Sequence, residues 1–191
     1  MRKGLPDRLN GLAERILSPD ILEGRGLGNE IAFFVFEYEP ASELDVRAFL
    51  PSLIRQIGER MPNLRLAHVD LLDIVKSLLD KEDLWSRAVS LESSAGATKS
   101  VSALQRFANA ERVAEHLARI HPPSATDLYL ISGVGAAYPL ARAHAVLSNL
   151  HSRIEGRPLV LLFPGSFSGM KLSLFDKLLD DHYYRAFRLE P

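Results

Sequence analysis

Short, mostly apolar segments alternate with longer amphipathic ones along this chain, and this alternation constrains its fold more than any other feature. Five apolar segments span 31–36, 64–69, 128–131, 159–163 and 186–189. Segments of this kind are typical of strands that are covered on both faces. Between them, apolar residues recur every three or four positions, which is the spacing of a helix. The pattern predicts an α/β fold: a single domain over 1–191, with a mostly parallel five-stranded sheet and helices on both faces.

The same periodicity places the helices. The chain opens with an amphipathic helical segment over 5–22, and one longer amphipathic helix is predicted over 104–118. Further helices are predicted around 140–150 and 172–179, before and after the fourth strand. Residues 93–100 are small and polar, so we predict a mobile connection there.

Two glycine-containing loops follow strands of the predicted sheet. In parallel sheets, ligands bind beyond the carboxyl ends of the strands. Gly133 and Gly135 follow the third strand, and Gly165 and Lys171 follow the fourth. Backbone amides in these loops could hold an anion, which would make them nucleotide or phosphate sites. A tight turn accounts for the same glycines, so both interpretations stay open.

The loop after the fourth strand resembles two catalytic patterns and lacks the reactive residue of each. Against a phosphate loop, Met170 occupies the second glycine, and Leu172 occupies the hydroxyl position that would hold magnesium. Against a nucleophile elbow, Phe167 occupies the serine position. We therefore expect a Rossmann-like or P-loop-NTPase-like sheet without an intact phosphate loop. We expect no catalytic residue, no cofactor and no enzymatic activity.

Candidate metal ligands are few. Asp70 closes the second strand, where it could hold magnesium or cap the helix that begins at Leu71; without a phosphate loop we favour the cap. His144 and His151 are two helical turns apart, about 10 Å along the axis, which is too far for one zinc ion. The chain has no cysteine. The sequence therefore predicts no metal site.

Charge and hydropathy limit the partners. A net charge of −1 argues against a broad phosphate-binding surface, which needs an excess of Lys and Arg. The longest apolar run, 159–163, is far shorter than the ~20 residues that span a bilayer. The absence of cysteine suits a reducing compartment. We expect a cytoplasmic protein with no membrane partner, whose contact with nucleic acid is indirect.

Several local strings together resemble one family. They are GLGNEI at 26–31, GVGAAYPLARAH at 133–144, VLSNL at 146–150, PLVLLFPG at 158–165 and DDHYYRAFRL at 180–189. In this order they resemble the BrxB family, a small component of bacterial BREX phage-resistance systems. The resemblance covers nearly the whole chain and is strongest from Asp127 onward.

The resemblance implies a role in an antiviral assembly with the phosphatase-like protein PglZ, a DNA methyltransferase and an ATPase. It implies no activity for this chain alone, so our first expectation is an adaptor that docks other BREX proteins. The alternatives are a nucleotide or phosphate sensor and a direct DNA-binding subunit. Aromatic and arginine side chains are frequent interface anchors. The candidate partner-binding residues within the family strings are Tyr138, Arg142, His144, Tyr183, Tyr184 and Arg185.

Overall fold

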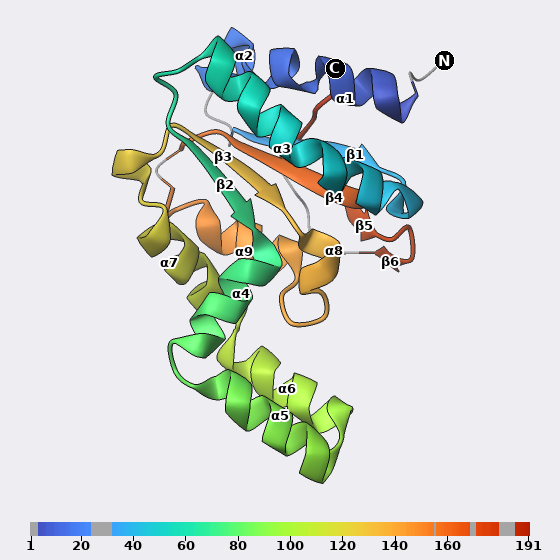
Figure 1. The fold of residues 1–191 in the computed structure, drawn as a ribbon, viewed down its shortest axis with the longest axis vertical. Coiled ribbons are helices and arrows are strands. Elements are labelled where there is room, and N and C mark those ends of the chain that lie inside the picture. The colour runs from blue at the N-terminus through green and yellow to red at the C-terminus, as the bar shows by residue number, and fades with distance from the viewer. Residues whose placement is uncertain (1–3, 24–31, 155, 169–170, 180–185) are drawn as a thin grey trace.

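The fold is built on a parallel sheet with the strand order β2-β3-β4-β1-β7 (Figure 1). The structure is a computed structural model of the chain, and it describes residues 4–23, 32–154, 156–168, 171–179 and 186–191. The strands of this sheet are β1 (Phe33–Tyr38), β2 (Leu66–Asp70), β3 (Leu128–Ser132), β4 (Leu159–Phe167) and β7 (Phe187–Arg188). Neighbouring strands run parallel throughout. The predicted α/β class and mostly parallel sheet are confirmed.

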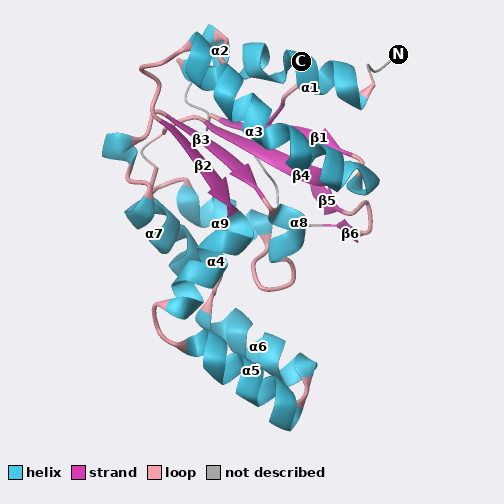
Figure 2. Ribbon diagram, viewed as in Figure 1, coloured by secondary structure: helices cyan, strands magenta, loops and turns pink. Residues whose placement is uncertain are grey.

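Helices cover both faces of the sheet, as Figure 2 shows. The side chains of β1 explain why, because all six residues are buried and successive side chains point to opposite faces. Phe34 and Phe36 pack in one core, whereas Phe33 and Val35 pack in the other. The first core is covered by α1 (Leu5–Ile16), α2 (Pro19–Leu22) and α3 (Glu43–Arg60). The second is covered by α4 (Leu71–Asp80), α7 (Ala110–Ile120), α8 (Val134–Ala137) and α9 (Ala143–Leu150).

The prediction of a helix around 172–179 is wrong, because this segment forms a hairpin of two short strands. These are β5 (Leu172–Leu174) and β6 (Leu178–Leu179). Beyond Pro164, β4 continues as a hairpin arm, and its Gly165 pairs antiparallel with Leu174. Glu37 anchors this arm: its buried carboxylate accepts the amide of Phe167 and lies 3.3 Å from Arg188 of the edge strand β7. Local leucine spacing does not reveal such a long-range anchor.

The segment between β2 and β3 also differs from its prediction. The single helix expected over 104–118 is two helices, α6 (Ala97–Phe107) and α7, because Asn109 caps α7 by accepting the amide of Arg112 at 3.0 Å. Residues 93–100, predicted as a mobile connection, contain the end of α5 (Leu84–Ala95), a turn at Gly96 and the start of α6. Their mobility stays a prediction. The α5–α6 hairpin projects away from the sheet (Figure 1).

The remaining described elements are short 3-10 turns at Pro40–Ser42 and Pro123–Ala125. Among the described residues, no helix has the length and apolar character needed to cross a membrane. The register brings the carboxyl ends of β1, β2 and β3 to one edge of the sheet, where Asp70 pairs with Ser132. The search for a functional site therefore starts at this edge.

Candidate functional site

Ligands of parallel sheets usually bind at the carboxyl ends of the strands, but the ends of β1, β2 and β3 leave little space. Tyr38, Asp70 and Ser132 end their strands there, and Glu43 reaches in from the start of α3. The Tyr38 hydroxyl donates to the Glu43 carboxylate at 2.7 Å, and burial together with this carboxylate raises the pKa of Tyr38. The cavity left between these groups measures about 10 Å³, which is room for about one water molecule.

Asp70 acts as a helix cap. Its Oδ1 accepts the amides of Leu72 at 2.9 Å and Asp73 at 3.3 Å. The same carboxylate lies directly against Gly133, where φ is +71° and an added Cβ would overlap it. An anion held at Gly133 would therefore face a negative charge at contact distance, which is unfavourable.

The other predicted anion-loop glycines also have packing reasons. A Cβ at Gly135 would lie 2.9 Å from the Phe175 ring, and a Cβ at Gly165 would overlap the Ser173 carbonyl oxygen. Lys171 lies between β4 and β5, directly before β5, and its backbone amide donates to the Ser168 hydroxyl at 3.1 Å. The four candidate residues therefore do not line one common anion site. Protein atoms lie within contact distance of the Cβ position of each of the three glycines.

Ser77 with His116 and Ser132 with His68 form hydrogen-bonded pairs among the described residues, and we tested each as a nucleophile with its base. Ser77 lies 2.7 Å from Nε2 of buried His116, whose Nδ1 accepts a hydrogen bond from Arg119 at 2.7 Å. Because Nδ1 is the acceptor, Nε2 of the neutral ring carries the proton and cannot take one from Ser77. Burial, and next Arg119, lower the pKa of His116 and keep it neutral.

The second pair is His68 with Ser132, 2.9 Å apart at the carboxyl edge. Ser132 is 4% exposed and lines a cavity of only about 10 Å³. Burial lowers the pKa of His68, and the nearby Asp70 partly opposes this. No cluster of metal-ligating side chains occurs among the described residues.

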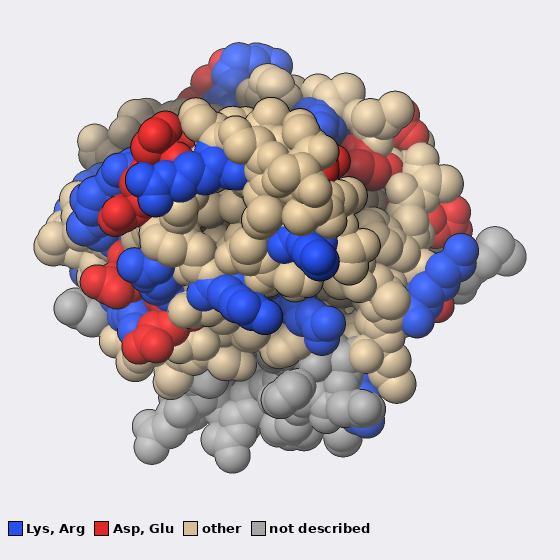
Figure 3. All heavy atoms as spheres, turned by 90° about the horizontal axis from the view of Figure 1, so that it is seen from below, with Lys and Arg blue, Asp and Glu red and all other residues tan. Residues whose placement is uncertain are grey.

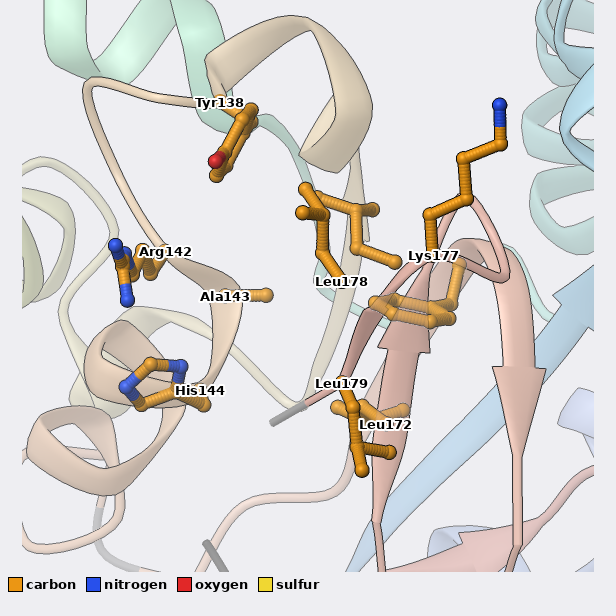
Figure 4. A pocket seen from close by; sticks show the side chains of 10 residues that line it. Tyr138, Arg142, Ala143, His144, Leu172, Lys177, Leu178 and Leu179 are labelled. Carbon is orange, nitrogen blue, oxygen red and sulfur yellow. The ribbon is translucent and has the colours of Figure 1, made fainter. Parts of the chain in front are cut away.

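Among the described residues, an open cleft of about 310 Å³ lies between the loop before α9 and the β5–β6 hairpin (Figure 4). Tyr138, Arg142 and His144 lie on one side, and Lys177, Leu178 and Leu179 lie on the other. Phe163, Leu172 and Leu174 supply further apolar lining. We call this the Tyr138 cleft.

Close packing positions both walls of the Tyr138 cleft. The ring of Phe175 packs beside Gly135 and meets the Tyr138 ring edge-on, with centroids 6.4 Å apart. Phe175 and Asp176 form the hairpin turn with positive φ values of 57° and 58°, which non-glycine residues rarely adopt. Such strain persists where the surrounding structure holds the residue in place. On the other wall, Gln105 of α6 donates to the Pro139 carbonyl at 2.7 Å.

The rim of the Tyr138 cleft is basic. The side chains of Arg142 and Lys177 are exposed and make no hydrogen bond or ion pair with other described residues. No described residue that lines the cleft carries a carboxylate. Figure 3, viewed from the tip of the α5–α6 hairpin, shows Lys and Arg in the lower middle of that face, whereas at its left margin basic and acidic side chains alternate.

The structure brings together half of the predicted partner-binding residues. Tyr138, Arg142 and His144 share the Tyr138 cleft, whereas 183–185, which hold Tyr183, Tyr184 and Arg185, lie outside the described residues. Sequence reasoning missed Lys177 and the leucines 178–179, because it placed them on a helix. The alternation of Leu172 and Leu174 around a serine was the available signal for a strand.

Comparison with known proteins identifies the family of the chain. The family model of BREX protein BrxB matches residues 67–189. A BREX protein BrxB from Bacillus cereus (strain H3081.97) is 32% identical over 191 residues, covering 96% of each chain. A BREX protein BrxB from Escherichia coli O9:H4 (strain HS) is 32% identical over 184 residues, covering 96% of this chain and 90% of that protein. No solved structure matches significantly. The chain belongs to the BrxB family of BREX proteins.

Proposed function

We propose that this protein is a non-enzymatic adaptor of a BREX phage-defence complex. In this role it docks the phosphatase-like PglZ and other BREX subunits and helps direct them to phage DNA. The observation that carries the proposal is the contrast between two sites. The cavity at the carboxyl ends of β1, β2 and β3 measures only about 10 Å³. The Tyr138 cleft is open and offers an apolar interior beside Arg142 and Lys177, whose side chains pair with no other described residue.

The composition of the Tyr138 cleft favours a protein partner. Tyrosine and arginine are enriched among the residues that dominate binding energy at interfaces, and both stand at this cleft in Tyr138 and Arg142. Leu178 and Leu179 are 40% and 63% exposed, so the apolar surface continues outside the cleft. Covering exposed leucines stabilises a complex through the hydrophobic effect.

Co-purification with PglZ tests the proposal. We expect wild-type protein to form a stoichiometric complex with PglZ, and the pair Tyr138→Ala/Arg142→Ala to break it while the protein stays folded, as circular dichroism would check. Arg55→Ala is the matched control, because Arg55 is an exposed arginine on α3, which covers the opposite face of the sheet. If no BREX subunit binds the wild-type protein, the adaptor function is excluded.

The same preparation separates the adaptor from the two alternatives. A nucleotide or phosphate sensor would gain RT ln(1 + [L]/Kd) in stability from its ligand, seen as a raised melting temperature. A DNA-binding subunit would bind DNA by itself with a steep salt dependence. We expect neither effect, because Asp70 stands against Gly133 and the net charge is −1.

A further inference from the structure

We infer that the Tyr138 cleft binds an extended segment of a partner protein in which a large apolar side chain lies within two residues of an aspartate or glutamate. The inference rests on the proposed adaptor function and adds the chemistry of what is docked. It follows from three properties of the cleft: the size of its interior, the sign of its rim, and the apolar strand beside it.

The interior suits an apolar side chain. Phe163 and Leu172 are almost fully buried where they line the Tyr138 cleft, and Leu174 is partly buried beside them. The volume of about 310 Å³ is at the lower end of the range of about 300–1,000 Å³ found for small-molecule sites. A leucine, phenylalanine or methionine from a partner would fill much of this space.

The positive charge of the rim favours an acidic residue in the bound segment. The Arg142 guanidinium and the Lys177 ammonium can only donate hydrogen bonds, so the bound group has to supply acceptors. They stand on opposite walls of the Tyr138 cleft, as Figure 4 shows. A carboxylate bound beside either of them would form charge-assisted hydrogen bonds, which are stronger than neutral ones. A basic partner would instead meet two cations of like sign.

The exposed strand favours an extended segment over a free small molecule. Leu178 and Leu179 continue the apolar surface along β6, and within the described residues β6 pairs only with β5. A chain that places one side chain in the cleft and runs along β6 would cover these leucines as well. A compact ligand confined to the cleft would leave them in water.

Photo-crosslinking in the assembled complex tests the inference. A benzophenone-bearing phenylalanine analogue replaces Leu179, which is 63% exposed and therefore tolerates the change. The protein is co-expressed with the other BREX subunits, irradiated, and the crosslinked peptide is sequenced by mass spectrometry. We expect a segment with an acidic residue within two positions of a large apolar one. A segment without Asp or Glu, or a complex that forms but yields no crosslink, would overturn the inference.

Charge reversal supplies an independent readout. Arg142→Glu/Lys177→Glu should weaken the complex at least tenfold, roughly the effect of disturbing charged pairs at an interface. Arg142→Gln/Lys177→Gln should weaken it less. Reversing the acidic residue of the crosslinked segment to lysine should restore binding to the Glu variant. Failure of that rescue would overturn the charge pairing, whereas the absence of any complex with the wild-type protein would exclude the adaptor function itself.

Discussion

The sheet core and the α5–α6 hairpin come from similar amphipathic sequence and differ sharply in packing. Every residue of β1 is buried, and α7 buries Val113, Ala114 and Leu117 completely. In the hairpin, α5 buries no residue, and α6 buries only Ser100, whose hydroxyl donates to the Ala88 carbonyl at 2.8 Å. Trp85 and Val89 are 42% and 54% exposed on α5.

This difference teaches that helical periodicity specifies a helix but not its stability. Most helical stability in proteins comes from packing an apolar face against other elements. The helices beside the sheet pack against a broad apolar surface, whereas α5 and α6 pack mainly against each other. Regions with few buried apolar contacts open at the lowest free energy, so we place the hairpin at that end of the stability range.

The largest effect should come from emptying the sheet core. Phe36→Ala removes a ring that is fully buried under α1 and α3, and we expect a loss of about 3–5 kcal/mol in the free energy of unfolding. Leu91→Ala, on the partly buried seam of the hairpin, should cost only about 1 kcal/mol. Urea unfolding followed by circular dichroism measures both, and equal losses would remove the distinction between the regions.

The next largest effect should come from the buried carboxylate that joins β1 to the β4–β5 hairpin. Glu37→Ala leaves the Phe167 amide and the Arg188 side chain without this acceptor, which should cost about 2–4 kcal/mol in unfolding free energy. Glu37→Gln keeps one acceptor oxygen and should cost less. A Glu37→Ala protein as stable as wild type would show that this contact does not hold the hairpin.

The only tryptophan of the chain allows the stability of the α5–α6 hairpin to be compared directly with that of the whole protein. Trp85 lies on α5, so its fluorescence reports on the hairpin, whereas the far-ultraviolet dichroism averages over the whole chain. We expect the fluorescence transition to begin at a lower urea concentration than the dichroism transition. Coincident transitions would mean that the hairpin unfolds cooperatively with the sheet.

The smallest effect concerns a surface ion pair of the sheet region. Asp127 accepts from Arg65 at 2.5 and 2.9 Å, and these hydrogen bonds lower the pKa of Asp127 to about 2. Because the folded pKa lies below the unfolded value of about 3.9, the stabilisation is complete above about pH 5 and is lost as the pH falls toward 2. Asp127→Asn should cost at most about 1 kcal/mol at pH 7. Urea titrations at pH 7 and pH 3 should show this difference shrinking; a difference that does not change with pH would contradict the assignment.

The sequence predicted the residues of the candidate site that lie in one continuous string. Tyr138, Arg142 and His144 were proposed together from 133–144, and the structure places all three at the Tyr138 cleft. The opposite wall was missed, because the leucine spacing of 172–179 is compatible with a helix. The hairpin there depends on Glu37 and Gly135, which are distant in sequence.

The sequence alone determined the α/β class, the parallel strands and the Asp70 cap, because these follow from local periodicity and from a side chain that reaches its own backbone. It also determined the family. Only the tertiary structure decided the strand order, the close packing at the carboxyl ends of β1, β2 and β3, and the opening of the Tyr138 cleft. Each of these depends on contacts between residues that are distant in sequence, such as Gly133 with Asp70 and Gly135 with Phe175. The hydrophobic periodicity of a single segment carries no information about such long-range contacts.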